Sequence, residues 1–155
     1  MQKIKLTQEK YALVDDQDFE YLNRWKWRIN SQGYAVRRVY IGSGMNRISK
    51  DIRMHRQIMN EPSGLEIDHI DLNGLNNQRN NLRIATHWQN LANRNIQSNN
   101  TSGYKGVSWS KQNKKWWAQI YINSKTISLG FYDDINEAVK VRNKAYKDRY
   151  GEFAR

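Results

Sequence analysis

The chain has 155 residues, with 26 Lys and Arg against 15 Asp and Glu, and a formal net charge of +11. This length suits one ordinary domain or two small ones, and the charge favours a polyanionic partner, most simply nucleic acid. The absence of cysteine excludes disulfides and any Cys-ligated zinc. Because the sequence shows no long apolar run and no signal-peptide pattern, we expect a cytoplasmic protein with no membrane partner.

The first sixty residues predict a small mixed module of strands and a helix. Apolar alternation and turn residues indicate strands over residues 11–14, 26–29, 34–40 and 48–54. A helix should follow Asp16, which we expect to be its N-cap residue. The nearby acids lack the Gly and Glu spacing of a calcium loop, so we assign Asp15, Asp16 and Asp18 to helix capping.

The middle of the chain predicts a strand, an Asn-rich loop, a second strand and a helix over residues 66–94. A short helix over residues 55–59 should precede it and end at Asn60 and Pro62. Thr86 and Gln89 have the spacing of a capping box at the start of the later helix. Residues 95–102 are polar and turn-forming, which is typical of a linker.

The last fifty residues predict three strands and a helix. The strands should cover residues 103–111, 116–123 and 127–132, with turns at Asn113-Lys114 and Ser124-Lys125. Asp134, followed by Glu137, should cap a helix that ends at Gly151. Alternation along the middle strand puts one set of side chains on one face (Trp116, Ala118, Ile120, Ile122) and the other set on the opposite face (Trp117, Gln119, Tyr121, Asn123).

Asp68-His69, then Asn81-Leu82, then Thr86 and Asn90 resemble the HNH nucleases, in the variant whose last member is Asn. The resemblance implies a ββα-metal (His-Me finger) core in which His69 is the general base. It also implies that Asp68 and Asn90 are ligands of one divalent ion, and that Asn81 holds the loop so that the imidazole points at the attacking water. Asn90 stands where many relatives carry His, and its neutral amide oxygen suits Mg²⁺ or Mn²⁺ better than zinc.

Several neighbouring residues leave alternatives open. Asn76, Asn77 and Asn80 could hold the loop in place of Asn81, and His87 could replace Asn90 as a ligand or stand exposed beside the helix cap. His55 could touch a phosphate or pack between a strand and a helix. Guanidinium groups fit phosphate oxygens well, so Arg56 and Arg94 are our candidates for phosphate contacts.

The C-terminal segment resembles the AP2 DNA-binding domain. The similarity rests on Tyr104-Lys-Gly-Val107, Lys115-Trp-Trp-Ala-Gln-Ile120, Leu129-Gly-Phe131, Glu137-Ala138 and Ala145-Tyr146. It implies that the outer face of the sheet lies in the major groove, with DNA contacts from Lys105, Trp117, Gln119, Tyr121 and Lys125. Ser108, Ser110 and Tyr121 stand where plant AP2 domains carry arginines, so the target sequence of those domains does not transfer.

Together these patterns predict an α+β protein in three segments. Residues 1–94 should form the N-terminal module and nuclease core, residues 95–102 the linker, and residues 103–155 a three-stranded antiparallel sheet plus helix of AP2-like type. The expected function is a Mg²⁺- or Mn²⁺-dependent endonuclease of homing type that nicks double-stranded DNA. We expect a monomer or weak dimer in the cytoplasm of a bacterial or phage-infected cell. The alternative is a non-catalytic DNA-binding regulator that keeps the HNH fold as a scaffold.

Overall fold

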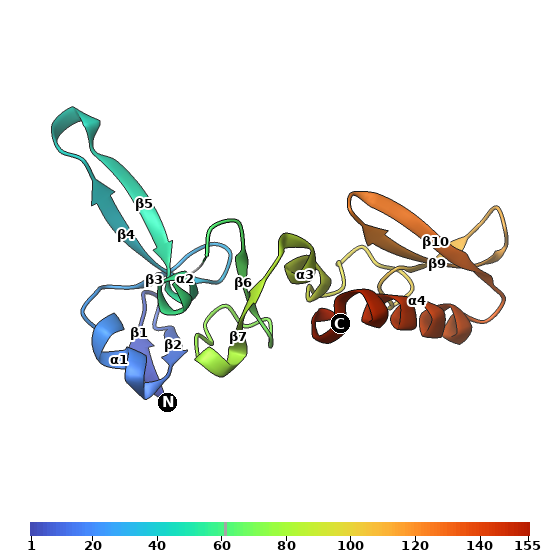
Figure 1. The fold of residues 1–155 in the computed structure, drawn as a ribbon, viewed down its shortest axis with the longest axis horizontal. Coiled ribbons are helices and arrows are strands. Elements are labelled where there is room, and N and C mark those ends of the chain that lie inside the picture. The colour runs from blue at the N-terminus through green and yellow to red at the C-terminus, as the bar shows by residue number, and fades with distance from the viewer. Residues whose placement is uncertain (61) are drawn as a thin grey trace. The chain divides into compact units, whose positions relative to one another are not determined.

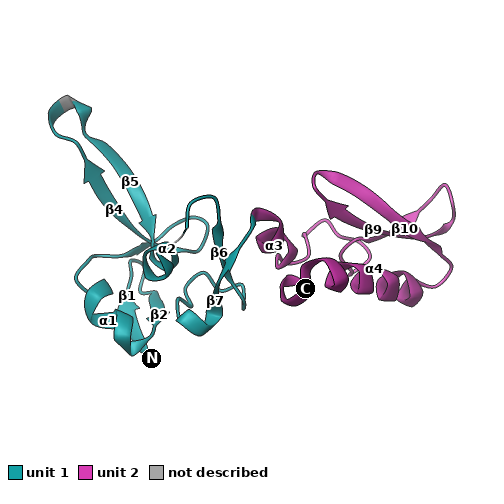
Figure 2. Ribbon diagram, in the orientation of Figure 1, with its two compact units in different colours: residues 1–86 teal, residues 87–155 magenta. Residues whose placement is uncertain are grey.

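The computed structural model describes residues 1–60 and 62–155. Both helices and strands are present, and the chain divides into two compact units, residues 1–86 and residues 87–155 (Figure 2). This division falls before the helix that contains Asn90, and the expected linker over residues 95–102 lies inside the second unit. Domain boundaries at residues 94 and 103 remain predictions.

The first unit is built from short elements (Figure 1). In chain order they are β1 (Gln2–Lys5), β2 (Tyr11–Val14), α1 (Asp16–Leu22), β3 (Arg28–Ile29), β4 (Ala35–Ile41), the 3₁₀ turn η1 (Gly44–Asn46), β5 (Ile48–Arg53), α2 (Met54–Met59), β6 (Glu66–His69), the 3₁₀ turn η2 (Arg79–Asn81) and β7 (Leu82–Ala85). Within it, β1 pairs with β2, β6 pairs with β7, and β3-β4-β5 form a three-stranded sheet, all antiparallel.

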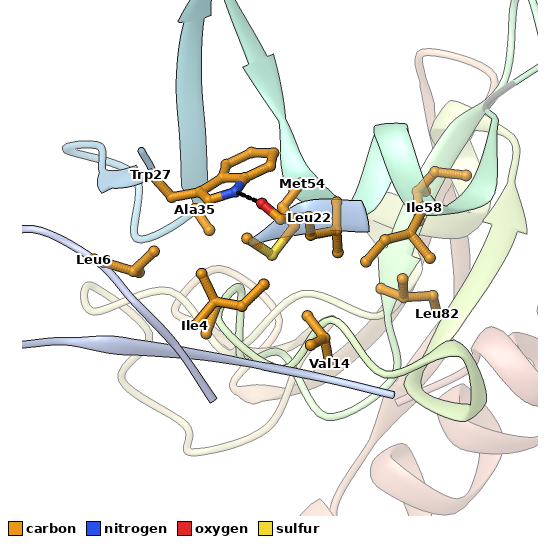
Figure 3. Close-up of a cluster of buried hydrophobic side chains, with 11 residues drawn as sticks. Ile4, Leu6, Val14, Leu22, Trp27, Ala35, Met54, Ile58 and Leu82 are labelled. Atoms are coloured by element: carbon orange, nitrogen blue, oxygen red, sulfur yellow. Dashed lines mark hydrogen bonds between the residues drawn. The ribbon is translucent and has the colours of Figure 1, made fainter. Parts of the chain in front are cut away.

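An apolar core joins most of these elements (Figure 3). Its largest fully buried members include Ile4 of β1, Val14 of β2, Leu22 of α1 and Met54 of α2. Each such side chain contributes roughly 1.5–3 kcal/mol relative to an exposed one. The indole Nε1 of the buried Trp27 donates a 2.8 Å hydrogen bond to the carbonyl of Leu22, which satisfies the end of α1. The core therefore fixes the base of β6, whose Ile67 belongs to the same cluster.

The predicted N-cap of α1 is wrong by one residue. Asp15 occupies the N-cap position, and its side chain makes no capping hydrogen bond. Asp16 is the first helical residue, and its carboxylate accepts hydrogen bonds from the N-terminal amine of Met1 at 3.0 and 3.1 Å. The side chains of Asp15 and Asp18 have other partners, described below with the candidate site.

The second unit is a sheet covered by one long helix. Its elements are α3 (His87–Ala92), β8 (Val107–Ser110), β9 (Lys115–Ile122), β10 (Lys125–Tyr132), α4 (Ile135–Tyr150) and the 3₁₀ turn η3 (Gly151–Phe153). The strands are antiparallel in the order β10-β9-β8. Asn123 and Ser124, with φ of 48° and 63°, form the two-residue turn between β9 and β10, one residue earlier than expected.

The long helix and the sheet meet over the face that the alternation predicted. Ala118 and Ile120 of β9 are buried, whereas Tyr121 is 52% exposed. Val107 and Ala118 pack with Ala138 of α4, joined by half-buried neighbours that include Trp116. At the start of α4, Asp134 accepts a 2.9 Å hydrogen bond from the backbone N–H of Asn136, and Gly151 ends the helix with φ of 54°.

Candidate active site

Asp68 and His69 lie at the end of β6, and both are almost fully buried, at 3% and 5% exposure. Successive strand residues point to opposite faces, so the carboxylate and the imidazole face different surroundings. Asp68 lies directly across from Arg83 of β7. Nε and Nη2 of Arg83 are 2.9 and 2.8 Å from Oδ2 of Asp68. The antiparallel register therefore supplies a counter-charge to the buried carboxylate.

The imidazole of His69 packs in a small cluster of rings. The ring centroid of His55 in α2 is 4.8 Å away with the planes at 88°, and that of Tyr34 is 5.7 Å away. Burial, reinforced by the electrostatic effects of His69, Arg53 and Arg56, lowers the pKa of His55 to about 3. The sequence left two roles open for His55, a phosphate contact or a packing role. In the structure its ring is buried and packs against His69.

The same surroundings favour the neutral form of His69. Burial lowers its pKa, while the hydrogen bond with Asn77 and the carboxylates of Asp71 and Asp68 act in the opposite direction. A neutral imidazole is the form that accepts a proton, so the site suits a general base at neutral pH.

Asn81, the residue predicted to hold the loop, links the two ends of the segment that joins β6 to β7 by hydrogen bonds. Its Nδ2 donates to Oδ1 of Asp71 at 2.9 Å and to the carbonyl of Asn76 at 2.8 Å. Its Oδ1 accepts from the backbone N–H of Asp71 at 3.0 Å, and its carbonyl accepts from Ile70 at 2.9 Å. Burial opposes ionisation of Asp71, yet hydrogen bonds from Asn76, Asn73 and Asn81 keep the pKa of this carboxyl below its usual value.

Asn77, one of the alternatives left open by the sequence, is the Asn that contacts the imidazole. Its Oδ1 lies 3.4 Å from Nε2 of His69, and the residue is 0% exposed. Its backbone N–H donates to the carbonyl of Leu13 at 2.8 Å, and its Nδ2 lies 3.5 Å from the carbonyl of Gly74. Asn77 is therefore fixed at both its main chain and its side chain while it faces the ring.

Gly74 allows the loop to approach the ring cluster closely. A Cβ at this position would lie 2.7 Å from Cδ1 of Tyr34 and 2.8 Å from the carbonyl of Gly33. Any side chain would push the loop away from Tyr34, which in turn packs against His69.

The N-terminal module holds the same loop from the other side. The backbone N–H of Leu13 in β2 donates to the carbonyl of Leu75 at 2.8 Å. Asp15 accepts from the backbone N–H of Arg79 at 2.8 Å, and Asp18 accepts from Nε and Nη2 of Arg79 at 2.8 and 2.7 Å. Asp15 occupies the N-cap position and Asp18 lies in the first turn of α1. Their carboxylates bond to Arg79, however, and so fasten α1 to a segment about sixty residues further along the chain.

The predicted metal ligands are a carboxylate and an amide. Among the described residues, no group of three or more His, Cys, Asp or Glu side chains could hold a metal ion, and the predicted set contains only one charged ligand, Asp68. Carboxylate and amide oxygens are nevertheless the hard donors that Mg²⁺ and Mn²⁺ prefer, so the chemistry of this pair fits such an ion. Asn90 lies in α3 of the second unit, and its pairing with Asp68, like the choice between Asn90 and His87, stays a prediction.

The basic residues predicted to contact DNA have different surroundings. Arg56 is exposed on α2, and Arg94 is exposed two residues after α3. The amine of Lys105 is half-buried and donates to the carbonyls of Arg155 at 3.0 Å and Ala92 at 3.3 Å. Burial, with the charges of Arg142 and Arg155, lowers the pKa of Lys105 to about 8. Lys105 is thus tied to the main chain of its own unit.

The sheet face opposite α4 carries the predicted aromatic row. Trp117 stacks with Phe131 at a centroid distance of 6.1 Å, and its Nε1 donates to Oγ of Ser128 at 2.8 Å. Tyr121 lies 6.0 Å from Trp88 of α3, ring to ring. Gln119 is half-buried, and Lys125 is exposed at the start of β10.

The segment that holds the candidate site is similar to known proteins. Residues 60–92, which hold Asp68, His69, Asn81 and Asn90, match a family model described as HNH endonuclease. Protein 3.8 of Escherichia phage T7 is 37% identical over 94 residues, which cover 61% of this chain and 77% of that protein. Residues 60–92 form an HNH endonuclease domain. A further relative, an uncharacterized HNH endonuclease of Acanthamoeba polyphaga mimivirus, is 29% identical over 144 residues, covering 93% of this chain and 73% of its own length.

The family assignment supports nuclease activity at the family level and a DNA substrate, and HNH endonucleases generally depend on a divalent metal ion. No solved structure matches the chain. Among the described residues, no helix has both the length and the apolar character needed to cross a bilayer.

Three residues of this HNH site were not assigned by sequence reasoning. Tyr34 carried no signal, because its contact with His69 joins segments 35 residues apart. Asn77 was only one of several candidates in an Asn-rich loop. Arg83 could have been found, because the antiparallel pairing of residues 66–69 with 82–85 places it opposite Asp68.

Proposed function

We propose that this HNH protein is a divalent-metal-dependent DNA endonuclease of homing type that nicks one strand at each active site. His69 is the general base, and Asp68 with Asn90 holds the metal ion. The observation that carries the proposal is a buried imidazole at the end of β6, held by Asn77 at 3.4 Å beside a buried carboxylate; burial also lowers the pKa of His69, which favours its neutral form.

The hydrogen bond to Asn77 determines which ring nitrogen of His69 accepts the proton. An amide oxygen accepts a proton and cannot donate one, so Oδ1 of Asn77 favours the tautomer with hydrogen on Nε2. Nδ1 is then the nitrogen that takes a proton from the attacking water. Asn81 keeps the loop that carries Asn77 closed through its bonds to Asp71 and Asn76. A divalent cation held by Asp68 and Asn90 would supply positive charge at the scissile phosphate and the leaving oxygen.

We also propose that residues 103–155, within the second unit, are an AP2-like DNA clamp that acts through the sheet face with Trp117, Tyr121 and Lys125. Residues 87–155 carry twelve basic and five acidic side chains, a net charge of +7. Together with the exposed ring of Tyr121, this charge supports a polyanionic partner on the face opposite α4.

A supercoiled-plasmid assay tests the activity. We expect conversion to the nicked circle with Mg²⁺ or Mn²⁺ and none after chelation. The variant Asp68→Asn, which keeps the shape and a hydrogen-bond acceptor for Arg83, should lose nicking at millimolar Mg²⁺, because the only charged ligand is gone. Asn90→Ala should lose less and be partly restored by excess Mn²⁺. Undiminished nicking by Asp68→Asn would show that the ion is held elsewhere.

A second candidate function, a DNA-binding regulator on an HNH scaffold, is favoured by one contact. Arg83 places both Nε and Nη2 on Oδ2 of Asp68, so the structure already gives this carboxylate a cationic partner. A protein that binds duplex DNA and fails to nick it with Mg²⁺, Mn²⁺, Ni²⁺ or Co²⁺ would support the regulator over the nuclease.

A further inference from the structure

The β4–β5 hairpin extends from the body of the first unit as a two-stranded ribbon (Figure 1). Six cross-strand pairs run from Val36 opposite Arg53 to Ile41 opposite Ile48, a length of about 20 Å. The third strand, β3, pairs with the first two residues of β4, and within the part of the chain that the structure describes no strand pairs with the outer part of the ribbon. An isolated two-stranded ribbon is only marginally stable in water. A ribbon that projects from the body is therefore a candidate for a functional role.

Exposed apolar and aromatic side chains concentrate at the outer end of this ribbon. Ile48 is 63% exposed, Tyr40 57% and Ile41 51%. The guanidinium of Arg47 lies 3.9 Å from the ring centroid of Tyr40. A flat side chain beside a cation at the end of a ribbon suits contact with sugars, bases and phosphates.

The net positive charge of the first unit equals that of this ribbon. Residues 35–53 carry five basic side chains (Arg37, Arg38, Arg47, Lys50, Arg53) and one acid, Asp51. The rest of residues 1–86 carries nine basic and nine acidic side chains, which cancel. The net charge of +4 on the hairpin is therefore the net charge of the whole unit. Arg38, Arg47 and Lys50 of the hairpin are exposed.

The ribbon joins the candidate active site through its base. β5 ends at Arg53, and α2 begins at the next residue and carries His55, whose ring packs 4.8 Å from that of His69. At the base, Arg53 lies over the ring of Tyr34 at 5.3 Å, and Tyr34 packs against His69 as well. A duplex gripped by the ribbon would therefore be held by an element continuous with the site that cuts it.

We propose that the β4–β5 hairpin is a DNA-binding arm that inserts its outer end, Tyr40 to Lys50, into a groove of the duplex beside the cleavage site. The major groove of B-DNA admits a two-stranded β-ribbon, and the charge and exposed side chains of the hairpin match such a partner. This inference rests on the proposed nuclease function for its substrate, and it adds a second grip that is separate from the sheet of residues 107–132.

The first test measures the salt dependence of binding to a 30-base-pair duplex by fluorescence anisotropy, in the full chain with His69→Ala and without metal. Arg47→Ala with Lys50→Ala removes two charges from the arm. If both meet phosphates, the slope of log K against log salt should flatten by about 1.8. The matched control is Lys5→Ala with Lys10→Ala, which removes two exposed charges from the same unit and should leave the slope unchanged.

A second test locates the arm on DNA without relying on affinity. The chain has no cysteine, so Ser43→Cys at the hairpin tip and Gln17→Cys on α1 each provide one attachment point for iron–EDTA. The Ser43→Cys conjugate should cleave the bound duplex over one or two base pairs of a groove at a fixed offset from the nick. The Gln17→Cys conjugate should give weaker and more diffuse cleavage.

The outcomes separate this inference from the nuclease assignment. Equal slopes for the two double variants, together with diffuse cleavage from Ser43→Cys, would overturn the arm even if the wild type nicks plasmid. A wild type that fails to nick, but shows the slope change and the localised cleavage, would overturn the nuclease and keep the arm. A wild-type dimer that Ile48→Glu converts to monomer, with no change in salt slope, would make the ribbon a self-association surface and refute the arm.

Discussion

The neutral body of the first unit and the basic regions of the chain differ in how they use charge. Outside the hairpin, residues 1–86 balance nine cations against nine anions, and the important ones are paired in place, as in Asp68 with Arg83 and Asp18 with Arg79. The hairpin carries +4 and the second unit +7. Paired and buried charges position groups, whereas unbalanced exposed ones attract a polyanion. This contrast is the basis of our proposal that chemistry and affinity are located in different parts of the chain.

The largest effect that tests this separation is His69→Ala. A general base typically contributes ~10²–10⁴-fold in rate, so nicking should fall by that factor. Binding of duplex DNA should be unchanged, because the unbalanced cations lie in the hairpin and in the second unit. The measurement is single-turnover nicking beside anisotropy titration of the same duplex. A variant that nicks at the wild-type rate, or that loses affinity and rate in parallel, would break the separation.

Asn77→Ala should give the next largest loss. The variant leaves His69 in place but removes the acceptor that orients Nε2, and a misdirected base can cost as much as about 10²-fold. The loss should appear in kcat with little change in KM, because Asn77 is buried and away from the basic surfaces. Asn80→Ala, an exposed neighbour in the same loop, is the control and should retain activity. Equal losses in the two variants would mean that general disturbance of the loop, rather than orientation of the ring, is responsible.

Sequence reasoning succeeded where a local pattern decides the structure. The alternation of β9 placed Ala118 and Ile120 inside and Tyr121 outside, because a strand covered on one face has period two. It missed β1, whose four residues include only one apolar side chain, Ile4, and whose strand conformation comes from pairing with β2.

The candidate site was predictable only in part for a similar reason. Asp68-His69 and Asn81 stand at recognisable intervals in one segment. The role of Asp18 depends on Arg79, 61 residues away, and an acid before or within the first turn of a helix fits a cap equally well. Choosing Asn77 over its neighbours required the path of the loop, which is set by its contacts with Leu13 in β2 and not by any spacing within the loop.

Acid should weaken the neutral body specifically, through the buried His55. Its folded-state pKa of about 3 lies below the ordinary value of 6.5. Between these values the unfolded chain binds a proton that the folded chain does not, so stability falls as pH falls from about 6.5 towards 3. At pH 5 the cost relative to pH 8 should be about 2 kcal/mol. His55→Phe should reduce this pH dependence in urea unfolding followed by the methyl resonances of Ile4 in the same unit. An equal pH dependence in wild type and variant would show that His55 is not the group responsible.

The smallest effect compares two acids of one helix. Asp18→Asn removes the charge that binds both Nε and Nη2 of Arg79, and because Arg79 is 43% exposed we expect a loss of only about 1 kcal/mol in stability. Asp16→Asn alters an exposed carboxylate that pairs with the N-terminal amine, and it should not affect the loop between β6 and β7. Hydrogen exchange at Asn77 and Asn81 is the sharper measurement, because Arg79 begins the turn between them. Faster exchange in Asp18→Asn alone would show that α1 holds the loop between β6 and β7 in place. Identical exchange in the two variants would mean that the contacts of Leu13 with Leu75 and Asn77 suffice without the ion pair.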